Sequence, residues 1–485
     1  MSAVPRSLRD AGGQRLALVL AGLLLVTAGC TAAQTTPSGT TSSASSRAES
    51  SLAPTPSAQA TACDEEPVTS SPGLVSGSFA DVVTTDLVMR TAPRISEDSD
   101  ITGELNQPAR VYISAGPVRA NGYEWWAVIP EGGNSESARW VAAAGKDGEV
   151  WLAPAPRDEG TWTILSRFDA MDVQREPYFA AVGPDRRVYL FGGRIGVIDP
   201  SPVASWVTFD PATCEWAQFD GMPFAPDGAR AVTATDGRMY VIAPHWDPEG
   251  EDPPTSDFAA FDPATGAWEE LATVPRTIGY GSGLAADTQG RIWTFGWDGV
   301  SSYDIDNANW TALEPLADIG NVDYASLMVD GRIAVLSAGA GGLHVFDPSA
   351  GGLATIGAPR VARYNATVAE IGPDRFVVAG GYLAGGCIVA DPPPEDIPAS
   401  PHYGLYDVVD TTTGAWQSLA PLELGFESNP LVIDGDLYAI GLDAEYDSSG
   451  SDPVLVKAEL VVARYTPAEA SGGSAADPGA GGCGG

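Results

Sequence analysis

A pair of short motifs recurs between residues 160 and 467 and constrains the fold of this chain more than any other feature. The first motif is an apolar strand that follows an Asp/Gly-type turn, and its six copies begin at Asp185, Asp236, Gln289, Asp330, Asp374 and Asp434. The second motif joins an aromatic strand to a tryptophan through a turn, as in Phe209 to Trp216 and Phe261 to Trp268. Repeats of this kind indicate stacked supersecondary units.

The residue types in the motifs predict strands that pack face to face. Asp-Gly supplies the positive φ values of a tight hairpin, and the aromatic positions fill the space between neighbouring sheets. A single four-stranded unit cannot bury its own apolar face, so such units stack around an axis. We therefore expect an all-β fold, with a six-bladed β-propeller over residues 160–467.

These motifs resemble Kelch repeats, whose signature is a double glycine followed by spaced tyrosine and tryptophan. Gly192-Gly193 and Gly380-Gly381 keep the double glycine, whereas blade two has Ala243-Pro244 instead. The sixth copy lacks its tryptophan strand, and an orphan strand of that type, Trp162 to Leu165, precedes the first blade. We expect this strand to complete the sixth blade, which would join the two ends of the propeller in one sheet.

Residues 78–155 differ from the repeats and read as short strands with polar turns, which is typical of a small barrel. The segment resembles bacterial Src-homology-3-like domains, through Val88-Met89-Arg90 and the later Asn121-Gly122-Tyr123 to Trp140-Val141. Members of that family often bind cell-wall glycans or peptides, so the resemblance implies a possible aromatic groove. Its candidates are Trp125, Trp126 and Trp140, and the alternative is that these rings fill the core.

The N-terminus has the composition of an export signal. Arg6, Arg9 and Arg15 precede a short apolar run from Leu16 to Val26, which is too short to span a bilayer comfortably. The segment ends in Ala28-Gly29-Cys30 and resembles the lipobox of bacterial lipoproteins. The resemblance implies that residues 1–29 are removed and that the Cys30 thiol carries a diacylglycerol, with palmitate among the attached lipids.

Two segments lack the apolar content to fold. Residues 30–77 are rich in Ser, Thr, Ala and Pro, and we expect them to tether the folded part to the membrane. Residues 468–485 form a Gly/Ser/Ala-rich tail. Cys63, Cys214, Cys387 and Cys483 permit disulfides in an exported chain, and the sequence leaves their pairing open. A Cys63–Cys483 bond would tie together the ends of the folded region.

The charge balance excludes some partners. The chain has 26 Lys and Arg against 63 Asp and Glu, a net charge of −37. Nucleic acids need basic patches, so we expect no nucleic-acid partner, and anionic lipid headgroups would repel the protein surface. Contact with the membrane is therefore expected through the lipid anchor alone. The acidity favours solubility outside the cytoplasm, and an alternative is a surface for cations or basic partners.

Candidate ligand contacts follow from the propeller prediction. The loops between the second and third strands and the connections between blades share one face, where long insertions occur at residues 243–257, 382–403 and 441–454. Around the axis, the candidate side chains are Arg276, Tyr280, Trp297, Arg363 and Tyr382. The alternative for each is structural, and an arginine at the head of an inner strand often binds backbone carbonyls.

No catalytic motif is present: the sequence has neither GxSxG nor HExxH, and no equivalent of the Tyr/His/Cys set of copper-radical oxidases. We expect no catalytic residue, no metal and no cofactor. The preferred hypothesis is a binding or scaffold protein on the extracytoplasmic face of a bacterial membrane, whose partner is an envelope protein or glycan. The alternative is a carbohydrate-active enzyme of the epimerase or mutarotase type, which would use charged residues in the central channel.

Overall fold

In the computed structural model of the chain, the described residues belong to one compact unit, residues 52–485. They are residues 66–68 and 73–468, apart from 98, 134–136, 146–148, 159, 174, 176–178, 196–200, 227–228, 245–255, 276–281, 297–298, 314–321, 338–341, 358–362, 384–404, 423–425 and 448–453. The predicted signal peptide, Cys30, most of the tether and the tail lie outside these ranges. Strands and turns make up the described part, in which no helix is long and apolar enough to cross a membrane.

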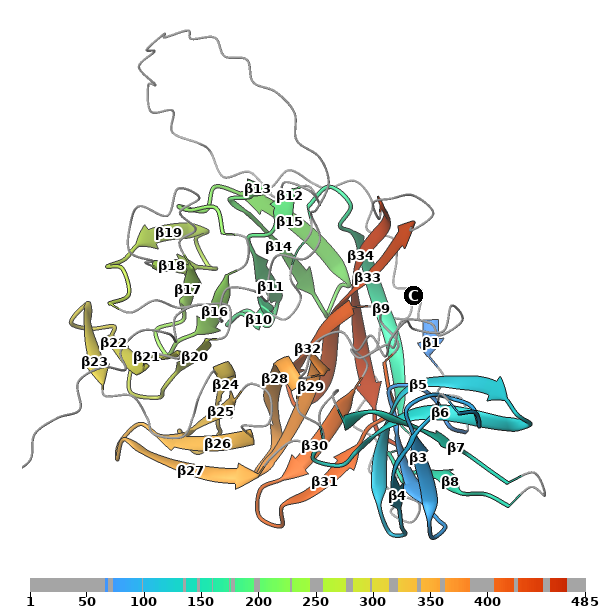
Figure 1. Cartoon of the computed structure of the whole chain (residues 1–485). Coiled ribbons are helices and arrows are strands. Elements are labelled where there is room, and N and C mark those ends of the chain that lie inside the picture. Colours follow the sequence, from blue (N-terminus) through green and yellow to red (C-terminus); the bar gives the residue numbers. More distant parts are fainter. Residues whose placement is uncertain are drawn as a thin grey trace, which may run out of the picture. The chain divides into compact units, whose positions relative to one another are not determined.

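Six antiparallel sheets follow one another along the chain and form the blades of a β-propeller (Figure 1). Blades one to three comprise β10 (Ala181–Val182), β11 (Val188–Phe191), β14 (Ser205–Asp210) and β15 (Glu215–Asp220); β16 (Arg230–Thr233), β17 (Met239–Pro244), β18 (Ser256–Asp262) and β19 (Ala267–Glu270); and β20 (Gly283–Ala286), β21 (Arg291–Gly296), β22 (Gly299–Asp304) and β23 (Asn309–Leu313). A short hairpin, β12 (Arg194–Ile195) with β13 (Ser201–Pro202), lies within blade one's sequence.

Blades four to six comprise β24 (Val322–Leu327), β25 (Ile333–Ser337), β26 (Gly342–Asp347) and β27 (Gly352–Gly357); β28 (Arg363–Gly372), β29 (Arg375–Leu383), β30 (Tyr406–Asp410) and β31 (Ala415–Ser418); and β32 (Phe426–Ile433), β33 (Asp436–Asp447), β34 (Val454–Thr466) and β9 (Thr161–Asp169). The innermost strands contact their neighbours in the order β10, β16, β20, β24, β28 and β32, and β32 contacts β10. The ring is thus closed, and the predicted six-bladed propeller is confirmed.

The repeat motifs occupy equivalent places in the blades. The turn before each second strand carries a residue with positive φ, such as Gly237 at 81° and Gly331 at 87°. The aromatic motif pairs the third strand with the fourth: Phe209 lies opposite Trp216, Phe261 opposite Trp268 and Tyr303 opposite Trp310. Blades four and five repeat this register with Phe346 opposite Leu353 and Val409 opposite Trp416.

The strand before blade one completes blade six, as predicted. β9 pairs with β34 so that Trp162 lies opposite Tyr465, which is the aromatic pair of the other blades. Trp162 is fully buried, and its indole N–H donates to the Ala420 carbonyl of blade five at 2.8 Å. In blade three, Trp310 donates to Ala272 of blade two at 3.0 Å in the same way. The closing strand therefore supplies the missing member of the repeat.

One strand at the outer edge of this blade was not foreseen. β1 (Glu66–Val68) pairs antiparallel with β9 and makes blade six a five-stranded sheet. The edge of a three-residue strand is short, which limits the unpaired backbone groups that it presents.

The double glycines lie where neighbouring blades approach closely. A Cβ atom on Gly192 would meet Pro226 of the next connection, and one on Gly380 would meet the backbone of Ser428 in β32. Both glycines also have positive φ, 79° and 65°. An L-residue with a side chain would be strained and would clash, so glycine is required at both points.

The N-terminal region forms a seven-stranded antiparallel sheet. Its order is β4 (Ile101–Leu105), β3 (Leu87–Arg90), β7 (Arg139–Ala142), β6 (Tyr123–Pro130), β5 (Arg110–Ala120), β2 (Phe79–Val82) and β8 (Leu152–Pro154). Val111, Ile113, Val128 and Val141 are fully buried in its core. The strands fall within the segment for which the sequence predicted a separate small β unit.

Candidate functional site

The predicted ligand contacts are divided between described and undescribed parts of the chain. Arg276, Tyr280 and Trp297 lie outside the described residues. Tyr382 belongs to β29, and its side chain is outside the described part. Arg363, the first residue of β28, is described in full.

Arg363 is built into the interior of blade five. Its guanidinium is 1% exposed and pairs with the fully buried Asp407 of β30, with Nη2 at 3.0 Å from Oδ2. Its Nη1 donates to the Gly380 carbonyl at 3.4 Å, and Ser418 donates its hydroxyl to Asp407 at 2.7 Å. A pair enclosed in this way is not available to a ligand, which favours the structural alternative for Arg363.

Blade one contains a second arginine of this kind. Arg175 is buried, and its guanidinium donates to the Gly192 carbonyl and to the carbonyl and hydroxyl oxygens of Ser205. Burial lowers the pKa of Arg175 to about 10, which leaves the side chain protonated at neutral pH. In both blades an arginine thus holds the carbonyl of the first glycine in the double-glycine motif.

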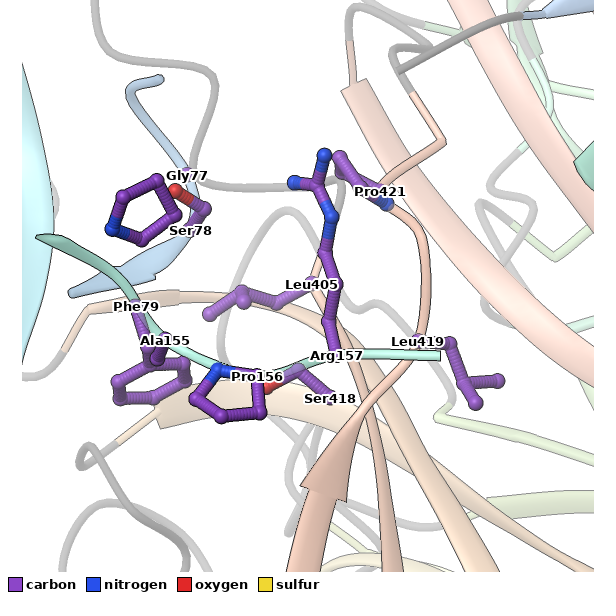
Figure 2. Close-up of a pocket in the computed structure, with 11 residues that line it drawn as sticks. Gly77, Ser78, Phe79, Ala155, Pro156, Arg157, Leu405, Ser418, Leu419 and Pro421 are labelled. Atoms are coloured by element: carbon purple, nitrogen blue, oxygen red, sulfur yellow. The ribbon is translucent and has the colours of Figure 1, made fainter. Parts of the chain in front are cut away.

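The N-terminal sheet contacts blade five next to the buried pair. Phe79, Tyr112, Ile129 and Ala155 form a small buried cluster with Leu405, which precedes β30. Figure 2 shows Phe79, Ala155 and Leu405 of this cluster. Burial raises the pKa of the Tyr112 hydroxyl, and the neighbouring Asp407 charge adds to this effect while Arg363 opposes it. The cavity at this junction has a volume of only about 10 Å³. It is large enough for one water molecule at most, so the junction is a packed seam.

Side chains from four blades meet on the propeller axis. Arg230 of β16 lies over the rings of Phe179, which precedes β10, and Tyr324 of β24, at 5.0 Å and 5.9 Å from the ring centroids. Asn429 of β32 is fully buried, hydrogen-bonds Tyr324 and donates to the Ala180 carbonyl at 2.9 Å. Burial raises the pKa of Tyr324, so this group stays neutral at physiological pH. The cluster thus joins side chains of blades one, two, four and six at one end of the innermost strands.

Below this cluster, an axial cavity of about 400 Å³ is lined by the innermost strands of the six blades. Its walls include small and branched side chains such as Ala231, Leu284, Ala325 and Leu431. The lining reaches Val182, Thr233, Ala286 and Glu370, which lie near the ends of their strands before the first turn of the blade, and Val329, which lies in that turn of blade four. The cavity therefore opens toward the face that carries the Asp/Gly turns.

Glu370 is the carboxylate in this lining. Its Oε2 accepts a hydrogen bond from the Val329 backbone N–H of the neighbouring blade. Burial raises the pKa of Glu370, and the charges of Asp330 and Asp374 add to this effect, whereas the Val329 N–H and Arg332 oppose it. The cavity thus combines a lining of mixed polar and apolar surface with one acidic group.

The three tryptophans predicted for a groove are enclosed by the N-terminal sheet. Trp125, Trp126 and Trp140 are 3%, 4% and 6% exposed. The Trp125 indole N–H donates to the Ala120 carbonyl at 3.0 Å, and that of Trp126 donates to Glu124 at 3.3 Å. Their burial favours the core-packing alternative, and ligand binding by these rings stays a prediction.

Sequence reasoning missed the groups that the structure brings together on the axis, namely Arg230, Tyr324, Glu370 and Asn429. The one available signal for the blade-five pair was Asp407, a carboxylate inside the otherwise apolar run Tyr406 to Val409. A charge at such a position predicts a buried partner. Within the described ranges, no three His, Cys, Asp or Glu side chains are grouped to hold a metal ion.

No family model matches this chain, and no curated protein matches it. Among solved structures, the chain is similar to a copper-bound fungal alcohol oxidase of the AA5 family. The two share 13% identity with a TM-score of 0.42, over 81% of this chain and 76% of the oxidase. At this degree of similarity, neither copper nor a substrate nor a reaction is carried over to the present chain.

Proposed function

We propose that the protein is an exported, lipid-anchored binding or scaffold protein whose Kelch-like propeller presents a rigid face to a protein or glycan of the bacterial cell envelope. The observation that carries this proposal is the nature of the channel. An enzyme of the epimerase type would need an arginine and a carboxylate that face a polar pocket together, whereas Arg363 and Asp407 are enclosed in blade five. The axial cavity exposes polar and apolar surface in nearly equal parts and has one carboxylate in its lining, Glu370, while the axial Arg230 lies against the rings of Phe179 and Tyr324.

The N-terminal sheet supports a scaffold role. It is joined to blade five by the cluster of Phe79, Tyr112 and Leu405, so the sheet and the propeller would move together. A Src-homology-3-like domain held in this way would place a wall-binding surface at a fixed distance from the propeller. The long insertions at residues 243–257, 382–403 and 441–454 would supply the variable contacts on the propeller face.

Anchoring is tested by Cys30→Ser in the full-length protein. We expect the wild-type protein to incorporate labelled palmitate and to sediment with membranes, and the variant to lose both properties because it lacks the acceptor thiol. Cys483→Ser is the matched control, and it should behave as the wild type. Membrane sedimentation of the Cys30→Ser protein without label would contradict the anchor.

Binding is tested with purified cell-wall glycan fragments and with envelope extracts passed over the immobilised protein. Saturable retention of one class without chemical change in the bound glycan is the expected result. Turnover of a glycan, detected as a new stereoisomer by NMR, would favour the enzyme alternative. Absence of retention from both sources would overturn the binding role.

A further inference from the structure

The axial cavity has the features of a ligand site rather than of a packing defect. Its volume of about 400 Å³ falls in the range of small-molecule pockets, and six strands from six blades form its wall. Residual voids in a packed core are much smaller, because apolar side chains interdigitate to fill them. The Arg230–Tyr324 cluster lies at one end of the cavity and the exposed Val329 lies at the other, so we place the entry of a ligand at the face of the Asp/Gly turns.

Two apolar side chains lie at the entrance of the cavity. Val329 lines the cavity and is 81% exposed, and the neighbouring lining residue Leu327 is 36% exposed. Leu327 is the last residue of β24, and Val329 lies in the turn that follows this strand. Exposed apolar side chains at the entrance of a cavity favour a ligand that has an apolar body.

The carboxylate of Glu370 in the lining determines which polar group a ligand would carry. Glu370 accepts the Val329 N–H through Oε2, and among the described residues its Oε1 has no hydrogen-bond partner. Nearby acidic groups increase the negative potential: Asp374 lies close, and Asp330 is already paired with Arg332 at 2.6 Å. A cationic donor could therefore bind Oε1, and the net charge of −37 would attract it to the protein.

We propose that this cavity binds a small organic cation with an apolar body, such as a primary alkylammonium or arylalkylammonium ion. The ammonium group donates to Glu370, and the alkyl or aryl part occupies the space between the six innermost strands. This site lies on the face that carries the Asp/Gly turns and does not depend on the envelope partner proposed above.

The contribution of the positive charge and that of the apolar chain can be separated with three compounds of equal chain length: hexylammonium, hexanol and hexanoate. Titration calorimetry with the full-length protein should show saturable binding of hexylammonium, weaker binding of hexanol, and none of hexanoate. Glu370→Gln should weaken hexylammonium binding about tenfold or more, because the charged acceptor is lost while the Val329 N–H keeps an oxygen partner. Glu445→Gln, at a carboxylate that is 65% exposed in blade six, is the matched control for nonspecific attraction.

A second variant tests the cavity itself. Ser326→Phe places a ring in the lining and should abolish hexylammonium binding, while the denaturation midpoint confirms that the variant is folded. Equal binding of the three compounds, or unchanged hexylammonium affinity in Glu370→Gln and in Ser326→Phe, would overturn the proposal. Reduced affinity in Glu445→Gln as large as that in Glu370→Gln would also overturn it.

Discussion

Arg363 and Asp407 form the most enclosed ion pair among the described residues, and its stability depends on both partners. Replacement of one partner leaves the other charge buried without its counter-ion. We expect Arg363→Met or Asp407→Leu alone to lower the free energy of unfolding by roughly 3–5 kcal/mol. The double variant should recover much of this loss, because it leaves no buried charge.

Chemical denaturation of the two single variants and the double variant measures this coupling. Because Tyr112 of the N-terminal sheet lies next to the pair, the single variants should also loosen the junction, which limited proteolysis near residue 155 can detect. Equal destabilisation by the double variant and by either single variant would contradict the assignment of a buried, mutually compensating pair.

The carboxyl group of Glu370 gives a pH dependence with a definite sign. Its pKa in the folded protein is raised, first by burial and then by nearby acidic charges. A raised pKa means that the folded state binds a proton more tightly than the unfolded state, so this contribution to stability is present at low pH and is lost as pH rises through the folded pKa.

Glu370→Gln has no carboxyl group to ionise, so it does not lose this stability as the pH rises. The variant should therefore become more stable relative to the wild type between about pH 4 and about pH 7. Denaturation midpoints of both proteins across this range measure the difference. A difference between the two proteins that does not change with pH would show that Glu370 ionises as it does in the unfolded chain.

At the level of the element, β9 is the strand on which closure of the ring depends. Trp162 is fully buried, with ring centroids at 4.7 Å from Tyr406 and 4.9 Å from Tyr465. We expect Trp162→Ala to lower the free energy of unfolding by about 3–5 kcal/mol, because it removes a large buried ring and a hydrogen bond between blades. Trp310→Ala changes the equivalent but half-buried residue of blade three and should lower the free energy of unfolding by a smaller amount. If Trp310→Ala lowered the melting temperature more than Trp162→Ala, closure of the ring would not be what limits stability.

The strand β1 gives a reason to predict one disulfide. Cys214, in the turn of blade one, is disulfide-bonded, and its partner lies outside the described residues. β1 begins three residues after Cys63 and pairs with β9 so that Glu66 lies opposite Ile164. Continuation of this register leads toward Ser166, which accepts a hydrogen bond from Trp216, two residues after Cys214.

We therefore expect a Cys63–Cys214 bond, which would exclude the Cys63–Cys483 bond considered from the sequence. Peptide mapping by mass spectrometry without reduction identifies the pair directly. In Cys214→Ser, Cys63 should become the newly alkylated thiol, with Cys387 and Cys483 unchanged. A peptide that links Cys214 to Cys387 or to Cys483 would contradict this pairing.

The strands could be predicted from the sequence more fully than the site. The second strands begin at Val188, Met239, Arg291, Ile333, Arg375 and Asp436, each one to three residues after the start of the corresponding copy of the first motif. These runs are local, and their turns require particular residues, so the sequence records them directly. Glu370 looks like any polar residue of a strand until six strands from distant parts of the chain are brought around one axis.

At the scale of the whole molecule, the seam with the N-terminal sheet and the closure by β9 favour unfolding as a single cooperative unit. The cluster of Phe79, Tyr112 and Leu405 connects the sheet to blade five, and β1 and β9 connect the N-terminal half of the chain to β34. Much of this packing links segments far apart in sequence, so its loss in one blade should propagate around the ring rather than stay local.

The acidity of the molecule should make its stability depend on salt. The chain carries a net charge of −37, and the attractive pairs in the blades are mostly local, such as Arg238 with Asp236 at 2.7 Å and Arg332 with Asp330 at 2.6 Å. Short exposed pairs contribute little each, whereas repulsion among the excess carboxylates acts over longer distances and opposes the compact state. Salt screens the long-range repulsion more strongly than the short pairs, since the screening length falls from about 30 Å at 0.01 M to about 10 Å at 0.1 M.

We expect the melting temperature to rise steadily as sodium chloride is increased over this range. Choline chloride should act equally, because screening does not depend on the identity of the cation. A melting temperature that falls with salt would mean that attractive pairs outweigh the repulsion, and a rise confined to one cation would indicate specific ion binding instead of screening.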